Sequence, residues 1–185
     1  MRPFTALTLA LLLWPGFEPQ KADEAIQLRF SAEDGQVHSP SSLPTPVLKA
    51  LATDDGVHPL LGSRLLPPPG WFSATKLTSL SIHEDLYLVE AEGELRGANV
   101  SSFWLIRNDT ISSQAKTMWT AAAHDVQLCY RKKELYPDIS VEKFSAHTSW
   151  GAVFHFDKDH YAIAYVRQGQ LPADLPLPYC PIQSR

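Results

Sequence analysis

Histidine and aspartate side chains gather in one short stretch near the C-terminus. His155, Asp157 and His160 lie within six residues, and imidazole and carboxylate groups are both zinc ligands. The stretch also fits a β-hairpin whose turn holds Asp157 and Asp159, because aspartate side chains hydrogen-bond to the local backbone of turns. The further ligands that a metal site would need lie elsewhere in the chain: His124, Asp125 or His147. We interpret the stretch as a turn and keep metal binding by His155, Asp157 and His160 as the alternative.

No pairing of nucleophile and base in the sequence predicts an active site. The chain lacks the G-x-S-x-G pattern that exposes a catalytic serine in α/β-hydrolases. His124 with Asp125, and His147 with Ser149, could form a triad, but geometry and not composition decides such sites. The alternating glutamates of residues 90–94 run into glycines, which is typical of a solvated strand end. We predict no catalytic residue and no cofactor, with a metal-dependent or histidine-based hydrolase as the alternative.

Aromatic residues are the better indication of a binding surface. The chain has five tryptophans, and aromatic rings either fill a core or mark a contact surface. Trp71 lies beside the three prolines of residues 67–69, so we expect it to be the tryptophan that is partly exposed. Asn99 begins an Asn-x-Ser sequon, but in a bacterial protein it would serve a loop, because asparagine tolerates left-handed backbone. The residues put forward for binding are Trp71, Asn99, Trp104, His124, His147 and Trp150.

The N-terminus predicts export. Residues 4–14 form an apolar run of about 16 Å as a helix, which is too short to span a membrane and typical of a signal peptide. We place the signal peptide at residues 1–22, and the mature chain should be periplasmic or secreted, without a membrane span. Its removal leaves 14 basic and 19 acidic side chains, a net charge of −5. This charge, with no basic cluster, argues against nucleic-acid binding.

The two cysteines of the chain predict a disulfide. Cys129 and Cys180 form an even count in an exported chain, whereas a redox pair normally has the spacing C-x-x-C. The bridge would tie the proline-rich C-terminal tail, from Gln168 onward, to the rest of the domain.

Proline, glycine and periodicity divide the mature chain into an N-terminal segment, residues 23–70, and a β-rich domain, residues 71–185. In the first, residues 25–30 form a possible strand, and a short helix is expected at residues 46–53 between Pro46 and Gly56. Short β-branched and aromatic segments in the second predict strands: 71–82, 86–91, 103–107, 115–123, 126–130, 139–144, 148–156 and 161–166. The expected fold is α+β and β-rich: one antiparallel sheet or partly open barrel of seven or eight strands with one helix.

Several short motifs resemble a pattern found in small exported bacterial proteins of unassigned function. They are Gly97–Arg107 (GANVSSFWLIR), Ala123–Asp125, Tyr136–Ile139, His147-x-Ser149 and Phe156-Asp157-x-x-x-Tyr161. The resemblance covers about residues 71–166, and Lys158 stands where that pattern usually has a turn glycine. It implies a compact, β-rich, exported bacterial domain and no particular activity. Together with the absence of a catalytic motif, it favours a non-enzymatic module that binds a protein or a component of the cell envelope.

Overall fold

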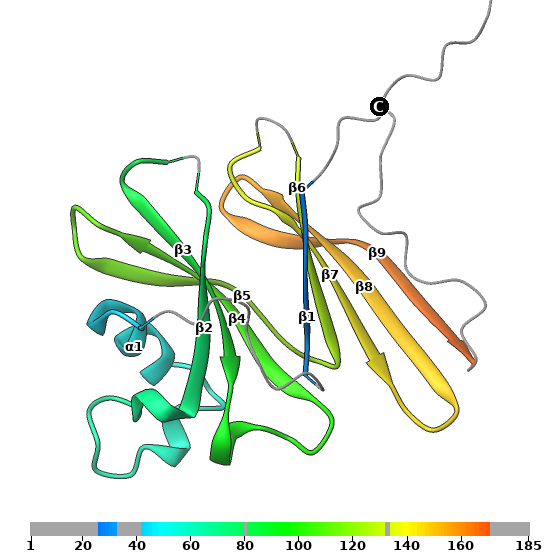
Figure 1. The fold of residues 1–185 in the computed structure, drawn as a ribbon, viewed down its shortest axis with the longest axis horizontal. Helices are drawn as coiled ribbons and strands as arrows, with labels where there is room; N and C mark the ends of the chain where they lie inside the picture. The colour runs from blue at the N-terminus through cyan, green and yellow to red at the C-terminus, as the bar shows by residue number, and fades with distance from the viewer. Residues whose placement is uncertain (1–25, 33–41, 80, 132–133, 171–185) are drawn as a thin grey trace, which may run out of the picture.

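A computed structural model describes residues 26–32, 42–79, 81–131 and 134–170 of the chain (Figure 1). The predicted signal peptide and Cys180 lie outside these ranges, so export and the disulfide remain predictions. No helix within the same ranges has the length and apolar character that crossing a membrane requires.

The described residues form nine antiparallel strands in two sheets. One sheet has five strands in the order β1-β6-β7-β8-β9, and the other has four in the order β2-β3-β4-β5. Their bounds are β1 Ile26–Ser31, β2 Phe72–Leu77, β3 Glu84–Ala91, β4 Ser101–Asp109, β5 Gln114–Ala123, β6 Asp125–Tyr130, β7 Asp138–Phe144, β8 Thr148–Asp157 and β9 His160–Gln170. The β-rich fold class is confirmed. The described strands are distributed over two antiparallel sheets and do not close into a barrel.

One α-helix, α1 (Thr45–Ala52), matches the predicted segment. Its buried residues Val47, Leu48 and Leu51 have the three- and four-residue spacing of one helical face. The helix begins at Thr45, and its N-cap residue Pro44 provides no side-chain hydrogen bond. Three short 3-10 helices follow in the chain: η1 His58–Leu60, η2 Pro69–Trp71 and η3 Gly93–Leu95.

The two sheets share one apolar core between their inner faces. Phe103 and Leu105 of β4 lie in this core together with Leu128 of β6 and Ile139 of β7, and all four are fully buried. On β8, Ala152 belongs to the core and its alternating neighbours pack against it, as the period-two pattern predicts. The outer face of the five-stranded sheet therefore carries the other set, which includes Val153 and His155.

Helix α1 and the loops around it cover the outer face of the four-stranded sheet (Figure 1). Trp104 and Ile106 of β4 point to this side and pack with Leu51 and Val57. Strand β4 lies between β3 and β5 and is buried on both faces, which accounts for its continuous apolar run.

The chain passes from one sheet to the other through a single residue, His124. Its backbone N–H donates to Glu142 and its carbonyl accepts from Ala32, so the corner is held by the five-stranded sheet. The ring accepts a hydrogen bond from the Phe144 N–H at Nδ1 (3.0 Å). His124, put forward for binding, is thus engaged in shaping this corner.

Candidate functional site

Asp138 and His155 form the most organised polar pair on the outer face of the five-stranded sheet. They lie opposite each other because Ile139 of β7 pairs with Phe154 of β8. The Nδ1 atom of His155 is 2.5 Å from Oδ1 of Asp138. Asp138 is buried, whereas the His155 side chain is 36% exposed. A buried carboxylate thus fixes an imidazole that reaches solvent.

Arg131 and Glu134 complete the cluster from the connection between β6 and β7. Arg131 forms an ion pair with Oδ2 of Asp138 and lies 3.8 Å from Glu134. Glu134, Asp138 and His155 each place one potential metal-ligand atom within 4.8 Å of the other two. Both oxygens of Asp138 are therefore engaged, one by a guanidinium and one by an imidazole.

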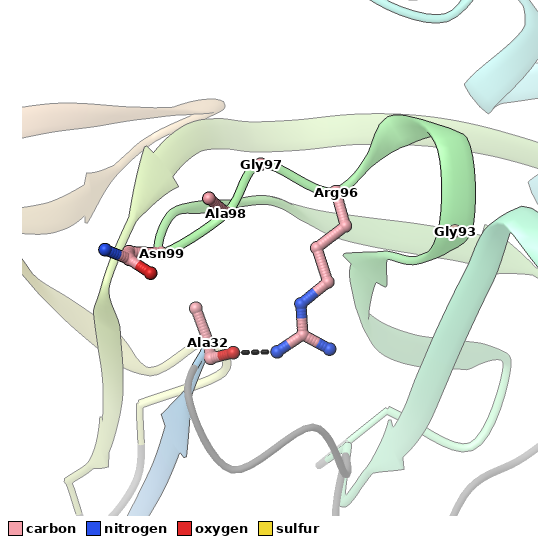
Figure 2. A pocket seen from close by; sticks show the side chains of 6 residues that line it. All are labelled: Ala32, Gly93, Arg96, Gly97, Ala98 and Asn99. Carbon is pink, nitrogen blue, oxygen red and sulfur yellow. Dashed lines mark hydrogen bonds between the residues drawn. The ribbon is translucent and has the colours of Figure 1, made fainter.

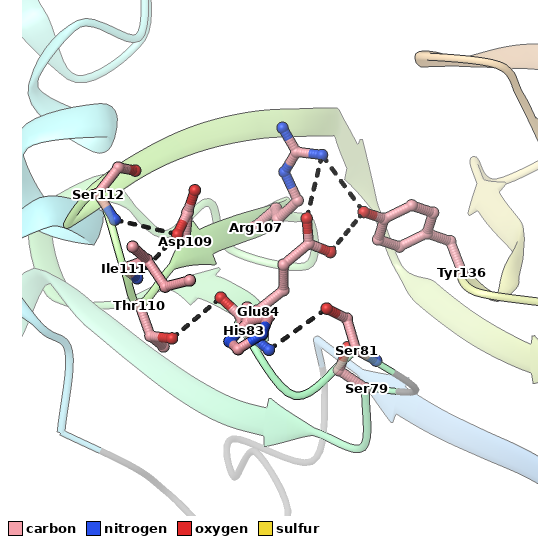
Figure 3. A network of polar contacts seen from close by, with 10 residues as sticks. All are labelled: Ser79, Ser81, His83, Glu84, Arg107, Asp109, Thr110, Ile111, Ser112 and Tyr136. Atoms are coloured by element: carbon pink, nitrogen blue, oxygen red, sulfur yellow. Dashed lines mark hydrogen bonds and ion pairs between the residues drawn. The ribbon is translucent and has the colours of Figure 1, made fainter.

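The start of β7 is held in place by contacts with both sheets. The Tyr136 hydroxyl donates to Oε2 of Glu84 at 2.8 Å, and Arg107 lies 3.4 Å from both the carboxylate and that hydroxyl (Figure 3). On the other side, the Tyr161 hydroxyl donates to the carbonyl of Pro137 at 2.8 Å. Burial raises the pKa of both tyrosines, so they remain neutral hydrogen-bond donors. These two anchors flank Asp138 and fix where its carboxylate lies.

The chemistry open to this cluster is limited by what His155 contacts. With Nδ1 directed at Asp138, Nε2 is the nitrogen left to accept a proton or bind a metal, as in sites where a carboxylate orients a histidine. Among the residues that the structure describes, no hydroxyl is hydrogen-bonded to either ring nitrogen of His155. The geometry supplies an oriented imidazole without the nucleophile that hydrolysis by a triad requires.

Of the three residues of the predicted metal alternative, Asp157 and His160 lie opposite each other on β8 and β9, but the ligand atoms that converge with His155 belong to Glu134 and Asp138. His155 turns to Asp138, while His160 is 2.9 Å from Asp159. Asp157 ends β8, and Lys158 with Asp159 forms the turn. Lys158 has φ of 58°, a conformation in which the glycine of the resembling pattern would be unstrained. The interpretation of this stretch as a hairpin turn is confirmed.

The predicted aromatic binding residues do not form one surface. Trp71 and Trp104 are both buried in the core beside α1, so the expectation that Trp71 is partly exposed is wrong. Trp104 donates its indole N–H to Asp54 at 2.8 Å. Trp150 is half-buried on the inner face of β8, and Lys143 lies over its ring at 5.6 Å. All three rings are accounted for by packing.

Asn99 lines an open hollow of about 540 Å³ beside the loop that precedes β4 (Figure 2). The Arg96 guanidinium crosses this hollow and donates to the carbonyl of Ala32. Glu92 pairs with the same guanidinium at 3.3 Å. Since Arg96 is already neutralised, the hollow offers a ligand mainly an amide and backbone groups. His147 is exposed in the turn between β7 and β8 and is not among the residues that line this hollow.

Comparison with protein-family models, curated proteins and solved structures finds no match to this chain. Its function must therefore be argued from its own surfaces.

Proposed function

We propose that the chain is an exported, non-enzymatic binding module that captures an extended apolar segment of another protein along strand β9. The observation that carries this proposal is the exposure of β9. Ile163, Tyr165 and Val166 are 60%, 48% and 49% exposed, and Ala164 between them is exposed too. Four consecutive residues of one strand thus stand open on both faces.

Strand β9 also has a free edge within the described part of the chain. It is the last strand of its sheet and pairs there with β8 alone. Proteins normally block such edges with charges, prolines or short strands, because unpaired backbone groups recruit other chains. The central residues 161–166 contain neither a charge nor a proline. An extended segment could add to this edge by backbone hydrogen bonding, with apolar side chains giving specificity.

Export and the disulfide belong to the same proposal. The signal-peptide pattern of residues 1–22, and the resemblance to exported bacterial proteins, support a periplasmic or secreted location. The pairing of Cys129 with Cys180 is supported by their even count and by the burial of Cys129. The partner would then be another exported protein or a protein of the cell envelope.

Replacing Ile163 and Val166 by lysine should weaken binding of the partner about tenfold or more. Burying one such aliphatic side chain contributes roughly 1.5–3 kcal/mol to the binding free energy. The measurement is photo-cross-linking in host cells, with the reactive group at position 165. A control lysine replaces Ile82, which is 88% exposed in the β2–β3 loop, and a control cross-linker replaces Leu65, which is 92% exposed. Discrete adducts at position 165 are expected, reduced by I163K/V166K and unaffected by I82K. Equal adducts at positions 65 and 165 would contradict a role for β9.

Metal binding is the second candidate, and the convergence of Glu134, Asp138 and His155 favours it. Against it, Arg131 places a positive charge on the carboxylate that the metal would need. If β9 binding is the function, zinc should leave the melting temperature of the mature protein unchanged. A rise of several degrees that chelator reverses and His155→Ala abolishes, but His160→Ala does not, would establish the metal site instead.

A further inference from the structure

A second cavity, of about 310 Å³, lies on the outer face of the four-stranded sheet, where the chain leaves α1. Its floor is formed by neighbouring residues of two strands, since Ser102 of β4 pairs with Ala122 of β5 and Trp104 pairs with Thr120. The turn that follows α1 and Leu95 of η3 form the walls. Pockets that hold small molecules begin at about 300 Å³, so this cavity is large enough for a small organic ligand.

Asp54 supplies the only charged side chain among the described residues that line the cavity. Its Oδ2 atom accepts the indole N–H of Trp104 at 2.8 Å, and its Oδ1 atom accepts the backbone N–H of Gly56 at 2.9 Å. The carbonyl of Asp54 accepts the N–H groups of Val57 and His58, which fixes the turn. The carboxylate is therefore held in position before any ligand arrives.

The charge of Asp54 is not compensated within the described ranges. Its carboxylate contacts two neutral donors and no cationic side chain, and each oxygen keeps a lone pair for a further donor. Asp55 and Glu94 are exposed beside the lining residues Asp54 and Leu95, and the helix dipole is negative at the C-terminus of α1. Lys49 is exposed on α1 and does not line the cavity. The cavity therefore favours a positively charged ligand.

The rest of the lining suits a ligand with a hydrocarbon part. Val57, Leu95 and Trp104 provide apolar walls. The hydroxyl groups of Ser102 and Thr120 make no hydrogen bond with the residues that the structure describes, so they remain available as acceptors. Apolar walls with a few converging polar groups are typical of small-molecule sites, and an ammonium group has three N–H donors to offer to such acceptors.

We propose that this cavity binds an organic ammonium ion. The ammonium group pairs with the carboxylate of Asp54, and the hydrocarbon chain lies against Val57, Leu95 and Trp104. Free alkylamines and lysine side chains share this chemistry. The site belongs to the four-stranded sheet, whereas β9 belongs to the other sheet, so this inference does not depend on a partner at β9.

Titration of the ¹⁵N-labelled mature chain with n-hexylammonium, followed by NMR, tests the site. The reporter is the assigned indole N–H signal of Trp104, because this group donates to Asp54. It should shift saturably, with a Kd on the order of 1 mM. The neutral analogue 1-hexanol has the same chain without the charge and should bind about tenfold more weakly or less, because a hydrogen bond to a charged group is stronger than one to a neutral group.

Three variants locate the ligand. Asp54→Asn removes the charge and should raise the Kd of hexylammonium about tenfold or more. Asp55→Asn is the matched control, because it removes the same charge from the next residue, which does not line the cavity, and it should leave the Kd within about twofold of the wild-type value. Ala122→Met fills the cavity without altering Asp54 and should also raise the Kd about tenfold or more. Circular dichroism verifies that each variant is folded.

A lysine peptide, acetyl-Gly-Lys-Gly-amide, distinguishes the two sources of the ammonium group. Tighter binding of the peptide than of hexylammonium would assign the site to a lysine of another protein, and weaker binding would assign it to a free amine. No saturable shift with either ligand, equal affinities for hexylammonium and 1-hexanol, or equal Kd values for Asp54→Asn and Asp55→Asn would each overturn the proposal. None of these outcomes involves cross-linking at position 165, so failure here and failure of the proposed function are distinguishable.

Discussion

The free energy of unfolding of the wild type should fall by about 3 kcal/mol between pH 4.5 and pH 8 because of Glu90. Replacing Glu90 by glutamine should abolish this decrease. Glu90 is 1% exposed on the inner face of β3, and its Oε1 atom has no hydrogen-bond partner among the described residues. Burial, and then the charge of Glu92, raise its pKa to about 7. The glutamates of residues 90–94 were predicted to lie at a solvated strand end, and for Glu90 that prediction is wrong.

The direction of the effect follows from proton binding. The folded protein holds the Glu90 proton more tightly than the unfolded chain, whose glutamates titrate near pH 4.5. The resulting stabilisation is complete below pH 4.5, decreases as the pH rises and is lost once the pH passes about 7. A glutamine at position 90 does not titrate, so the stability of E90Q lacks this dependence.

Urea unfolding at pH 4.5, 6 and 8 measures the difference. The free energy of unfolding of E90Q relative to wild type should increase by about 3 kcal/mol across that range. Glu94→Gln is the control, because Glu94 is exposed four residues further along, and it should retain the pH dependence of the wild type. Parallel curves for wild type and E90Q would show that Glu90 is charged in the folded protein at pH 6.

Local sequence patterns were sufficient to locate the strands but not to assemble them. Every predicted strand is present, because alternation of apolar residues records which side chains face a core. The two-sheet arrangement depends on His124, where β5 runs directly into β6 and the chain changes sheets. A single histidine between two strands carries no sequence signal for such a change of sheet. Strand pairing also depends on contacts between residues that are distant in sequence.

The Asp138–His155 pair was missed although the sequence contained a usable signal. Residues 139–144 and 148–156 were both predicted as strands, with a short turn between them. A hairpin centred between Ala146 and His147 places Ile139 opposite Phe154 and therefore Asp138 opposite His155. Asp157 and His160 are close to His155 in sequence. In an antiparallel sheet, however, the side chain that His155 contacts can lie on the adjacent strand, as Asp138 does.

The tryptophan predictions failed where a loop packs on a sheet. Trp71 follows three prolines, a context typical of exposed connectors. The structure places it under the Arg64 guanidinium, 5.8 Å from the ring centre, within the core formed with α1. Composition identifies the proline-rich connector before Trp71, but it does not show that the connector packs into the core beside α1.

If the proposed Cys129–Cys180 bridge forms, reducing it should lower the free energy of unfolding by about 4 kcal/mol, the largest effect expected for this protein. The bridge would close a loop of 52 residues, and cross-linking a loop of that length removes about 4 kcal/mol of conformational entropy from the unfolded chain. Urea unfolding of the mature protein with and without dithiothreitol measures this loss. Cys180→Ser is the control, since it should match the reduced wild type and show no response to the reductant.

The same experiment separates the two ways in which the tail can stabilise the fold. Oxidised protein with Gly-Ser-Gly-Ser-Gly at residues 173–177 would keep the loop closed but lack the alanine, leucine and proline side chains of that segment. Its free energy of unfolding should fall between those of oxidised and reduced wild type. A value equal to oxidised wild type would assign the whole effect to loop closure. An equal response of wild type and Cys180→Ser to dithiothreitol would contradict the bridge, because Cys180→Ser has no intramolecular disulfide to reduce.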